Sequence, residues 1–325
     1  MQMLGILAGL VSAVLQSCSY IASAVFLRRH GSPRDMLFYS QAVQFLFAVP
    51  ILFAFAPEGA LADRGLFMAN AFWLVIFTIT QFSMFAAQRT VEPSKIATWL
   101  GLKIVVLAVL TTFWPINGES VSALKWLAIA ITISAVWLLN QSGGMKPGWR
   151  GALYLALLIG VSSLCDRQQV LIIGEFRKYG VGLFAGSALT LALGYATFGL
   201  FAIGCVLADW RRLLHASAPV RGGRMLSAFN PVVAREVWKK LRDSFPFAAF
   251  WFSAMMCIYF CYGELGPVFG NVVQSTRSVI AVAIGILAVR LFSLGVETPV
   301  SRSMWMRRFV AAALMSAGII LYSCL

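Results

Sequence analysis

Four ionisable residues stand inside long apolar stretches of this sequence. They are Lys103, Arg277 and the neighbouring pair Asp166 and Arg167. A charged side chain at the centre of a bilayer costs at least ~2.5–3.5 kcal/mol, so such residues persist where they face a partner or a wet cavity. We therefore take these four positions as the starting point for a candidate site.

The two cations Lys103 and Arg277 can be placed at equivalent positions of an internal repeat, with 103–106 laid over 277–280. In an inverted repeat, two such cations would approach the midplane from opposite sides and could grip one anion together. Asn271 and Gln274 precede Arg277 on the same apolar run and are expected to orient that ligand. The pattern therefore predicts an anionic substrate.

Two alternatives remain open for the same residues. Lys103 or Arg277 could form a buried structural ion pair with Asp166, or each long side chain could reach a membrane interface. Asp166 could balance charge or couple protons, whereas Arg167, about 100° away on a helix, cannot face the same partner. In each case the cations outnumber the single carboxylate, and an anionic ligand would correct this imbalance.

The composition of the chain shows where these residues must act. The chain has 325 residues, of which 60% are hydrophobic and only 12% charged, and its mean hydropathy is +0.83. Soluble domains carry roughly 25% charged residues, so an all-α membrane protein is predicted. The net charge of +14 lies mainly between apolar runs, which is typical of loops on the cytoplasmic face. We expect contacts with membrane lipids and none with nucleic acid.

A helix needs about 20 apolar residues to cross the hydrocarbon core of a bilayer. By this measure we predict ten transmembrane helices, with the first retained as a span because its basic residues follow its apolar core. The predicted spans lie near 3–27, 36–56, 66–88, 94–114, 122–140, 151–173, 181–208, 245–262, 267–291 and 306–325.

These spans divide into two halves. We predict a first five-helix repeat at 1–142, a linker at 143–150, and a second five-helix repeat at 151–325 that contains a basic cytoplasmic loop at 209–244. Five spans per half make the second half upside down relative to the first, as in many secondary transporters. Within the loop, 232–242 reads as a short basic amphipathic helix that lies on anionic lipid, with a protein-docking site as the alternative.

Both halves contain a span that ends in a Glu-containing turn and leads into a helix rich in small residues. The turns are 113–119 and 292–297, and their Glu119 and Glu297 are expected to cap the following helices. This duplicated pattern resembles the drug/metabolite transporter superfamily, in particular its EamA-like members, over nearly the whole chain. The resemblance implies a ten-helix carrier. It also implies that basic residues on the spans of Lys103 and Arg277 bind phosphate, as in the superfamily's sugar-phosphate transporters.

The orientation of the chain follows from its basic loops. Eight of the 26 Lys and Arg residues lie in 209–244, between the seventh and eighth predicted spans. Most of the rest lie in the other loops that follow an odd-numbered span. The positive-inside rule then places these loops in the cytoplasm and both termini outside, whereas the resemblance implies cytoplasmic termini for several members. We expect the chain to reside in a bacterial cytoplasmic (inner) membrane.

Further polar and aromatic residues inside the spans are candidates for hydrogen bonding between helices or for lining a cavity. They are Gln16, Ser17, Gln41, Gln44, Gln81, Gln168, Gln169, Ser275, Thr276, Tyr20, Trp99, Tyr259 and Tyr262.

The sequence thus predicts a secondary transporter of a small anionic metabolite that works by alternating access. Without a phosphate-cradling glycine loop, transport must run on a gradient or by exchange. The alternatives are a flippase for a lipid with a phosphate headgroup, and an amino-acid or drug exporter in which the basic pair is structural. The only histidines, His30 and His215, are expected in loops. We therefore expect no enzyme activity, no metal and no cofactor.

Overall fold

The computed structural model describes residues 2–115, 121–140, 148–216, 231–292 and 301–323. These residues are almost entirely helical, and no strand occurs among them. The helices are α1 (Gln2–His30), α2 (Pro33–Phe55), α3 (Arg64–Ala87), α4 (Pro93–Trp99), α5 (Lys103–Phe113), α6 (Ala123–Asn140), α7 (Trp149–Arg177), α8 (Leu183–Ala216), α9 (Pro231–Leu265), α10 (Pro267–Gln274), α11 (Arg277–Phe292) and α12 (Arg302–Ser323).

Seven helical segments in the described part of the chain are long and apolar enough to cross a membrane, which makes this an all-α integral membrane protein. They are α1, α2, α3, α7, α8, α9 and the segment Lys95–Phe113, in which α4 and α5 follow one another. The turns at 113–119 and 292–297, with Glu119 and Glu297, lie wholly or partly outside the described residues.

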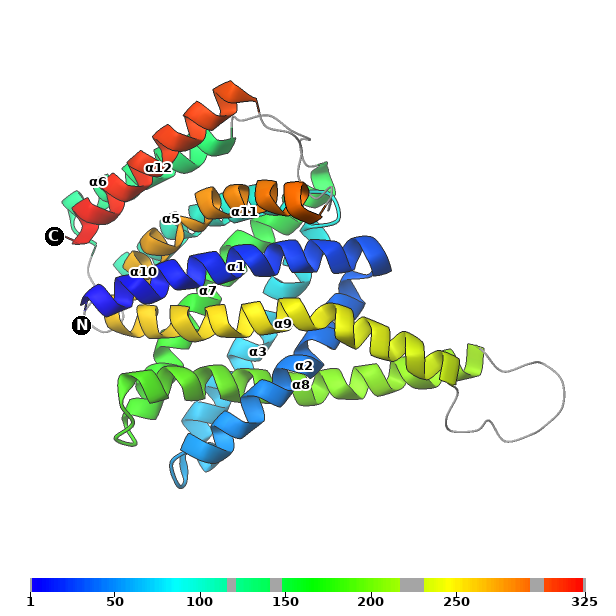
Figure 1. The fold of residues 1–325 in the computed structure, drawn as a ribbon. Helices are drawn as coiled ribbons and strands as arrows, with labels where there is room; N and C mark the ends of the chain where they lie inside the picture. The colour runs from blue at the N-terminus through cyan, green and yellow to red at the C-terminus, as the bar shows by residue number, and fades with distance from the viewer. Residues whose placement is uncertain (1, 116–120, 141–147, 217–230, 293–300, 324–325) are drawn as a thin grey trace, which may run out of the picture.

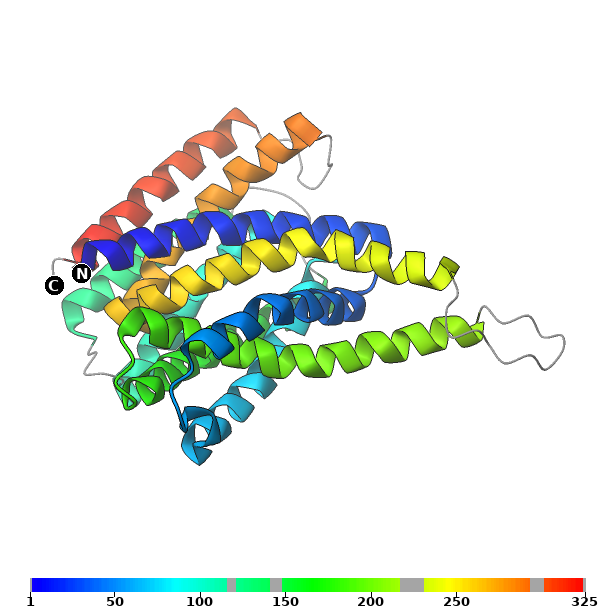
Figure 2. The ribbon, with the colours of Figure 1, turned by 60° about the horizontal axis from the view of Figure 1, so that its bottom comes forward.

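The helices pack as antiparallel and crossing pairs that are far apart in the sequence. The most extensive contacts join α1 with α9, α2 with α8, α3 with α7, and α6 with α12. Figure 1 shows α6 and α12 as an outer layer above α5, α10 and α11, with α1 and α9 below them. The N- and C-terminal ends lie at one end of the bundle, and α8 and α9 extend beyond it at the other (Figures 1 and 2).

The expected loop at 209–244 is helical at both of its ends. Helix α8 continues to Ala216, and α9 already begins at Pro231, a favourable first helical residue. The amphipathic stretch is therefore the first part of α9 and not a separate helix. Its Val233 and Val237 are buried in a cluster with Tyr39 and Leu214, so this part of α9 packs against α2 and α8. Likewise, α7 begins inside the expected linker 143–150.

Two helical paths are interrupted. Between α4 and α5 the chain makes a 3₁₀ turn, η2 (Leu100–Leu102), and α10 and α11 are separated at Ser275 and Thr276. Lys103 is the first residue of α5, and Arg277 is the first residue of α11. Broken helices in membrane proteins occur where the backbone is buried in protein or lines a cavity. Both candidate cations thus follow directly after a break.

The approach to the second break uses one conformationally special glycine. Gly266 connects α9 to α10 with φ of +82°, a left-handed value that a residue with a Cβ rarely adopts. Pro267 then occupies the first position of α10. This sharp connection brings α10 back against the end of α9, where the polar residues of the two helices meet.

Candidate functional site

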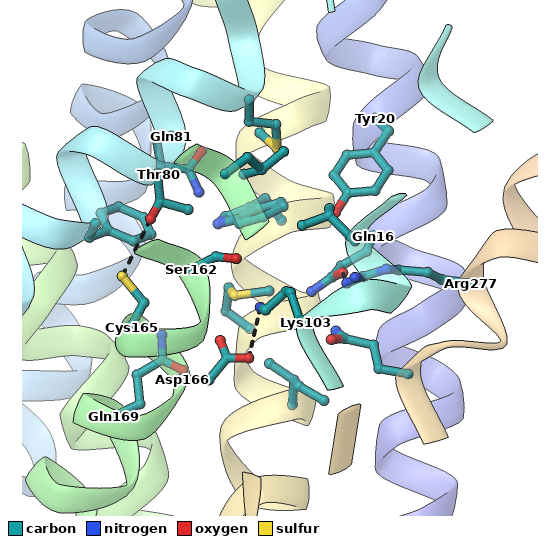
Figure 3. Close-up of a pocket in the computed structure, with 18 of the residues that line it drawn as sticks. Gln16, Tyr20, Thr80, Gln81, Lys103, Ser162, Cys165, Asp166, Gln169 and Arg277 are labelled. Atoms are coloured by element: carbon teal, nitrogen blue, oxygen red, sulfur yellow. Dashed lines mark hydrogen bonds and ion pairs between the residues drawn. The ribbon is translucent and has the colours of Figure 1, made fainter. Parts of the chain in front are cut away.

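The described side chains enclose a pocket between α1, α3, α7, α9 and the two broken helices. Its empty space measures about 480 Å³, a volume that includes open solvent at its mouth. Lys103, Asp166 and Arg277 line it and are only 5%, 6% and 3% exposed. Figure 3 shows Lys103 and Arg277 entering the pocket from separate elements, with Asp166 opposite Lys103.

Three donors converge on one carboxylate oxygen of Asp166. Lys103 Nζ lies 2.7 Å from Asp166 Oδ2, the Tyr262 hydroxyl donates to it at 2.9 Å, and Asn271 Nδ2 donates at 2.8 Å. The donors come from α5, α9 and α10, so this single atom ties three elements to α7. A buried carboxylate needs such compensation, because its removal from water is costly.

The Tyr262 hydroxyl is a second atom at which several hydrogen bonds of this cluster meet. It lies within hydrogen-bond distance of Gln274 Oε1, at 3.3 Å, and accepts from Asn271 Nδ2 at 2.9 Å. The ring of Tyr262 is held against Gly270, where an added Cβ would lie 2.5 Å from the ring atom Cδ1. Gly270 therefore allows α10 to approach the ring closely enough for the polar contacts to form.

Arg277 has a different environment from Lys103. One of its terminal nitrogens donates to Gln16 Oε1 at 2.9 Å, and its Nε is buried with no partner among the described residues. No described carboxylate lies within 4.0 Å of its guanidinium, so its charge is not paired. The guanidinium is a planar set of donors suited to a carboxylate or a phosphate.

Other polar atoms of the pocket also remain available for hydrogen bonding. Both amide atoms of Gln81 and the Oε1 atom of Gln169 are buried, and the described residues offer them no partner. An unpaired buried polar group costs about 1–3 kcal/mol, so these groups are suited to a polar ligand.

The pocket also has an apolar wall. Phe77, Met84, Trp251 and Met255 line it, and Trp251 is fixed because its indole nitrogen donates to the Tyr195 hydroxyl at 2.7 Å. The charged groups and this wall together form an amphipathic space. It can accept a ligand that carries an anionic group on a small body.

The structure brings most of the sequence-predicted site residues together. Lys103, Arg277, Gln274 and Asp166 line one pocket, and Asn271 lies beside it, bonded to Asp166. Of the other candidates, those that line the pocket are Gln16, Tyr20, Gln81, Gln169 and Tyr262, whereas Gln41, Gln44, Trp99 and Tyr259 are not part of its lining.

Arg167 is not part of the pocket. Its guanidinium NH2 lies 3.4 Å from the Trp114 carbonyl oxygen, in agreement with the rotation of about 100° between adjacent helical residues. The sequence reasoning missed Thr80, Ser162 and Trp251, which also line the pocket. Thr80 donates to the Ile76 carbonyl of its own helix, an ordinary arrangement for Thr in a span, so it gave no signal.

No protein-family model matches the sequence, and no curated protein matches it either. A solved structure described as "Crystal structure of protein" resembles this chain with a TM-score of 0.63 and 11% sequence identity. The match covers 100% of this chain and 98% of the other. At this identity the similarity concerns the fold alone, and it shows that the whole helical bundle is an arrangement that another protein also adopts.

Proposed function

We propose that this chain is a secondary transporter of a small anionic metabolite. It works by alternating access and belongs to the drug/metabolite transporter superfamily, near the EamA-like members. The observation that carries the proposal is the convergence of Lys103 and Arg277, each the first residue after a helix break, on one enclosed pocket. Discontinuous helices that meet at a midplane site are a recurrent feature of such carriers.

The packing of the helices supports ten spans in two inverted five-helix repeats. If α1, α2 and α3 correspond to α7, α8 and α9, the contact of α1 with α9 corresponds to that of α7 with α3. The contacts of α2 with α8 and of α6 with α12 are then contacts between equivalent helices, and the contact of α4 with α11 corresponds to that of α10 with α5. A pseudo-twofold axis between 1–142 and 151–325 accounts for all of these pairs.

The charges of the pocket support an anionic substrate. Among the described residues that line it, two cations, Lys103 and Arg277, face one carboxylate, Asp166. The first turns of α5 and α11 begin at these cations, so the positive ends of two helix dipoles add to the same field. An anion would offset this excess.

The burial of the charged side chains favours a solute over a lipid. Lys103, Asp166 and Arg277 are all at most 6% exposed, whereas a lipid headgroup would need a passage to the bilayer for its attached chains. The flippase and the amino-acid or drug exporter remain distinguishable outcomes of the experiment below.

The experiment is the thermal stability of the purified protein with carboxylated, phosphorylated, zwitterionic and cationic compounds. A ligand at 100 times its dissociation constant adds about 2.7 kcal/mol if it binds the folded state alone. We expect stabilisation by anions, lost in Arg277→Gln and kept in the matched control Lys240→Gln, which lies outside the pocket. Stabilisation by zwitterions or cations alone would contradict the proposal, and stabilisation by phospholipids alone would favour the flippase.

The same proposal includes the placement of the chain in a bacterial cytoplasmic membrane. The basic ends of α8 and α9 lie opposite the ends that carry the two termini (Figure 1). The positive-inside rule then puts these basic ends of α8 and α9 at the cytoplasmic face and the termini outside. A reporter that is active on one side only, fused to the C-terminus, would test this orientation.

A further inference from the structure

Lys103 has the capacity to hold Asp166 and a ligand at the same time. Its ammonium group has three donors, and Asp166 Oδ2 at 2.7 Å accounts for one of them. One terminal nitrogen of Arg277 donates to Gln16, and its Nε has no partner in the described part of the chain. An anion that binds both cations therefore does not have to remove Asp166 from the pocket.

The number of charges in the pocket then depends on the charge of the ligand. With Asp166 ionised, Lys103 and Arg277 leave one excess positive charge among the described lining residues. A singly charged anion makes the sum zero, whereas a doubly charged anion makes it negative. An uncompensated charge in a buried site is costly, and protonation of a carboxylate relieves it.

We propose that Asp166 is the proton acceptor that matches the pocket to the charge of its ligand: a dianion binds together with one proton, and a monoanion binds without one. This inference rests on the proposed function and adds the coupling of that same site. The proton comes from the solvent and binds the Asp166 carboxylate, and no covalent bond to the ligand forms or breaks. Lys103 then directs its donors to the anion.

The surroundings of Asp166 can accommodate both of its forms. The Tyr262 hydroxyl donates to the ionised carboxylate at 2.9 Å, and it has an alternative acceptor in Gln274 Oε1 at 3.3 Å. When Asp166 is protonated, the hydroxyl can turn to Gln274, and its oxygen then accepts the new proton of Asp166. Asn271 can keep its hydrogen bond to the carboxyl group throughout. The exchange needs a rotation of one hydroxyl and no movement of a helix.

The other titratable groups that face Asp166 keep one form near neutral pH. Tyr and Cys side chains ionise above about pH 8 in their ordinary state, and Lys and Arg above about pH 10. These groups are Tyr20 on α1, Cys165 on α7, Lys103 on α5, Tyr259 and Tyr262 on α9, and Arg277 on α11, while α3 and α10 present amides and a threonine. Asp166 is therefore the group of this cluster suited to take up a proton on binding.

The experiment compares two probe anions of similar shape and different charge. Sulfate is a dianion and methanesulfonate a monoanion from about pH 5 to 8, so neither probe titrates itself. We expect the dissociation constant of sulfate to fall by about tenfold for each unit of decreasing pH, because one proton binds with it. That of methanesulfonate stays constant. Calorimetry in buffers of different ionisation enthalpy should give about one proton taken up with sulfate and about none with methanesulfonate.

Asp166→Asn should remove the pH dependence of sulfate binding without weakening methanesulfonate, since the pocket then carries two cations that no carboxylate compensates. Tyr262→Phe is a second variant that keeps every charge, and it should reduce the proton uptake that accompanies sulfate because the carboxyl group loses one of its hydrogen-bond partners. Equal pH dependence for both anions, or a sulfate dependence that survives in Asp166→Asn, would overturn this inference and leave the anion site standing. Binding of neither anion to the wild-type protein would overturn the anion site and this inference together.

Discussion

Two clusters of charged residues lie in this bundle, and they differ in how their charges balance. The cluster at the basic end joins α2, α8 and α9: Lys240 Nζ lies 2.8 Å from Asp35 Oδ2 and 3.3 Å from Asp209 Oδ2. Arg212 pairs with Asp209, which also accepts from the Tyr39 hydroxyl at 2.9 Å. Two cations therefore meet two carboxylates. In the pocket, Lys103 and Arg277 share Asp166 among the described residues.

This difference separates a structural cluster from a binding site. In the cluster at the basic end, two cations pair with two carboxylates and fasten helix ends, so the charges of that cluster balance. Near them, His30 and Arg29 at the end of α1 lie 3.1 Å and 3.5 Å from Asp243 Oδ2. The expected position of His30 in a loop is therefore wrong, because α1 includes it as its last residue and Asp243 anchors it to α9. In the pocket, two cations face one carboxylate among the described residues, and the guanidinium of Arg277 and nearby amide atoms have no partner for some of their polar atoms.

The largest expected effect is on the pocket ion pair. Lys103→Ala leaves Asp166 as a buried carboxylate with only neutral donors, which should lower the free energy of unfolding by about 3–5 kcal/mol. Lys103→Gln combined with Asp166→Asn removes both charges and should recover most of that loss. Thermal unfolding of the purified variants measures this, and a double variant as unstable as Lys103→Ala would show that the pair is not coupled.

A smaller effect is expected at the basic end. Lys240→Ala removes the cation between Asp35 and Asp209, and the loss of charged hydrogen bonds should cost about 2 kcal/mol. Stabilisation by anions should remain as in the wild-type protein, because the pocket is untouched. If Lys240→Ala abolished anion binding, the comparison between the two clusters would fail.

Arg277→Gln should change stability by only about 1 kcal/mol, since the residue makes a single side-chain hydrogen bond, to Gln16. The same change should abolish stabilisation by anions. Thermal unfolding with and without sulfate separates the two quantities. A large loss of stability without ligand would instead assign Arg277 a structural role.

The smallest effect is expected at the end of the bundle that carries the turn before α3. There the Tyr179 hydroxyl, at 2.6 Å from Asp63 Oδ2, and the Leu66 amide hold the pKa of Asp63 below its ordinary value of 3.8. A lowered folded-state pKa stabilises the fold above the unfolded pKa, and this stability is lost as the pH falls through the folded one. Tyr179→Phe should therefore lower the melting temperature slightly near neutral pH. The difference from wild type should shrink as the pH falls below 3.8 and vanish below the lowered pKa of Asp63 in the folded state. A constant difference at all pH values would assign the effect to packing.

Much of the helical framework could be predicted from hydropathy. Each expected apolar run falls mainly on helical residues in the part of the chain that the structure describes. Hydropathy did not predict how far two helices extend beyond their apolar runs. Residues 209–216 belong to α8 and 231–244 to α9, where burial of Val233 and Val237 stabilises the helix. Hydropathy predicts which residues of a helix lie in an apolar environment, but it does not predict where that helix ends.

The site could be predicted only in part. Lys103, Asp166 and Arg277 stood out because charge in an apolar run is costly, but either cation was an equal partner for Asp166 in the sequence. The fold resolved this: Lys103 pairs with Asp166, and Arg277 is bonded to Gln16, a residue 261 positions away. Trp251 gave no signal, since a Trp near the beginning of a span is ordinary at a membrane interface.

The sequence by itself determined that the chain is an apolar, all-helical membrane protein and that a few internal charges need a special environment. Both properties follow from local sums of transfer free energy, which do not depend on which helices are neighbours. Only the tertiary structure decided that Lys103 and Arg277 follow helix breaks and enter one pocket. It also decided that Asp166 pairs with Lys103 and not with Arg277. Those features arise from contacts between distant segments, where geometry selects one pairing among several that the composition allows.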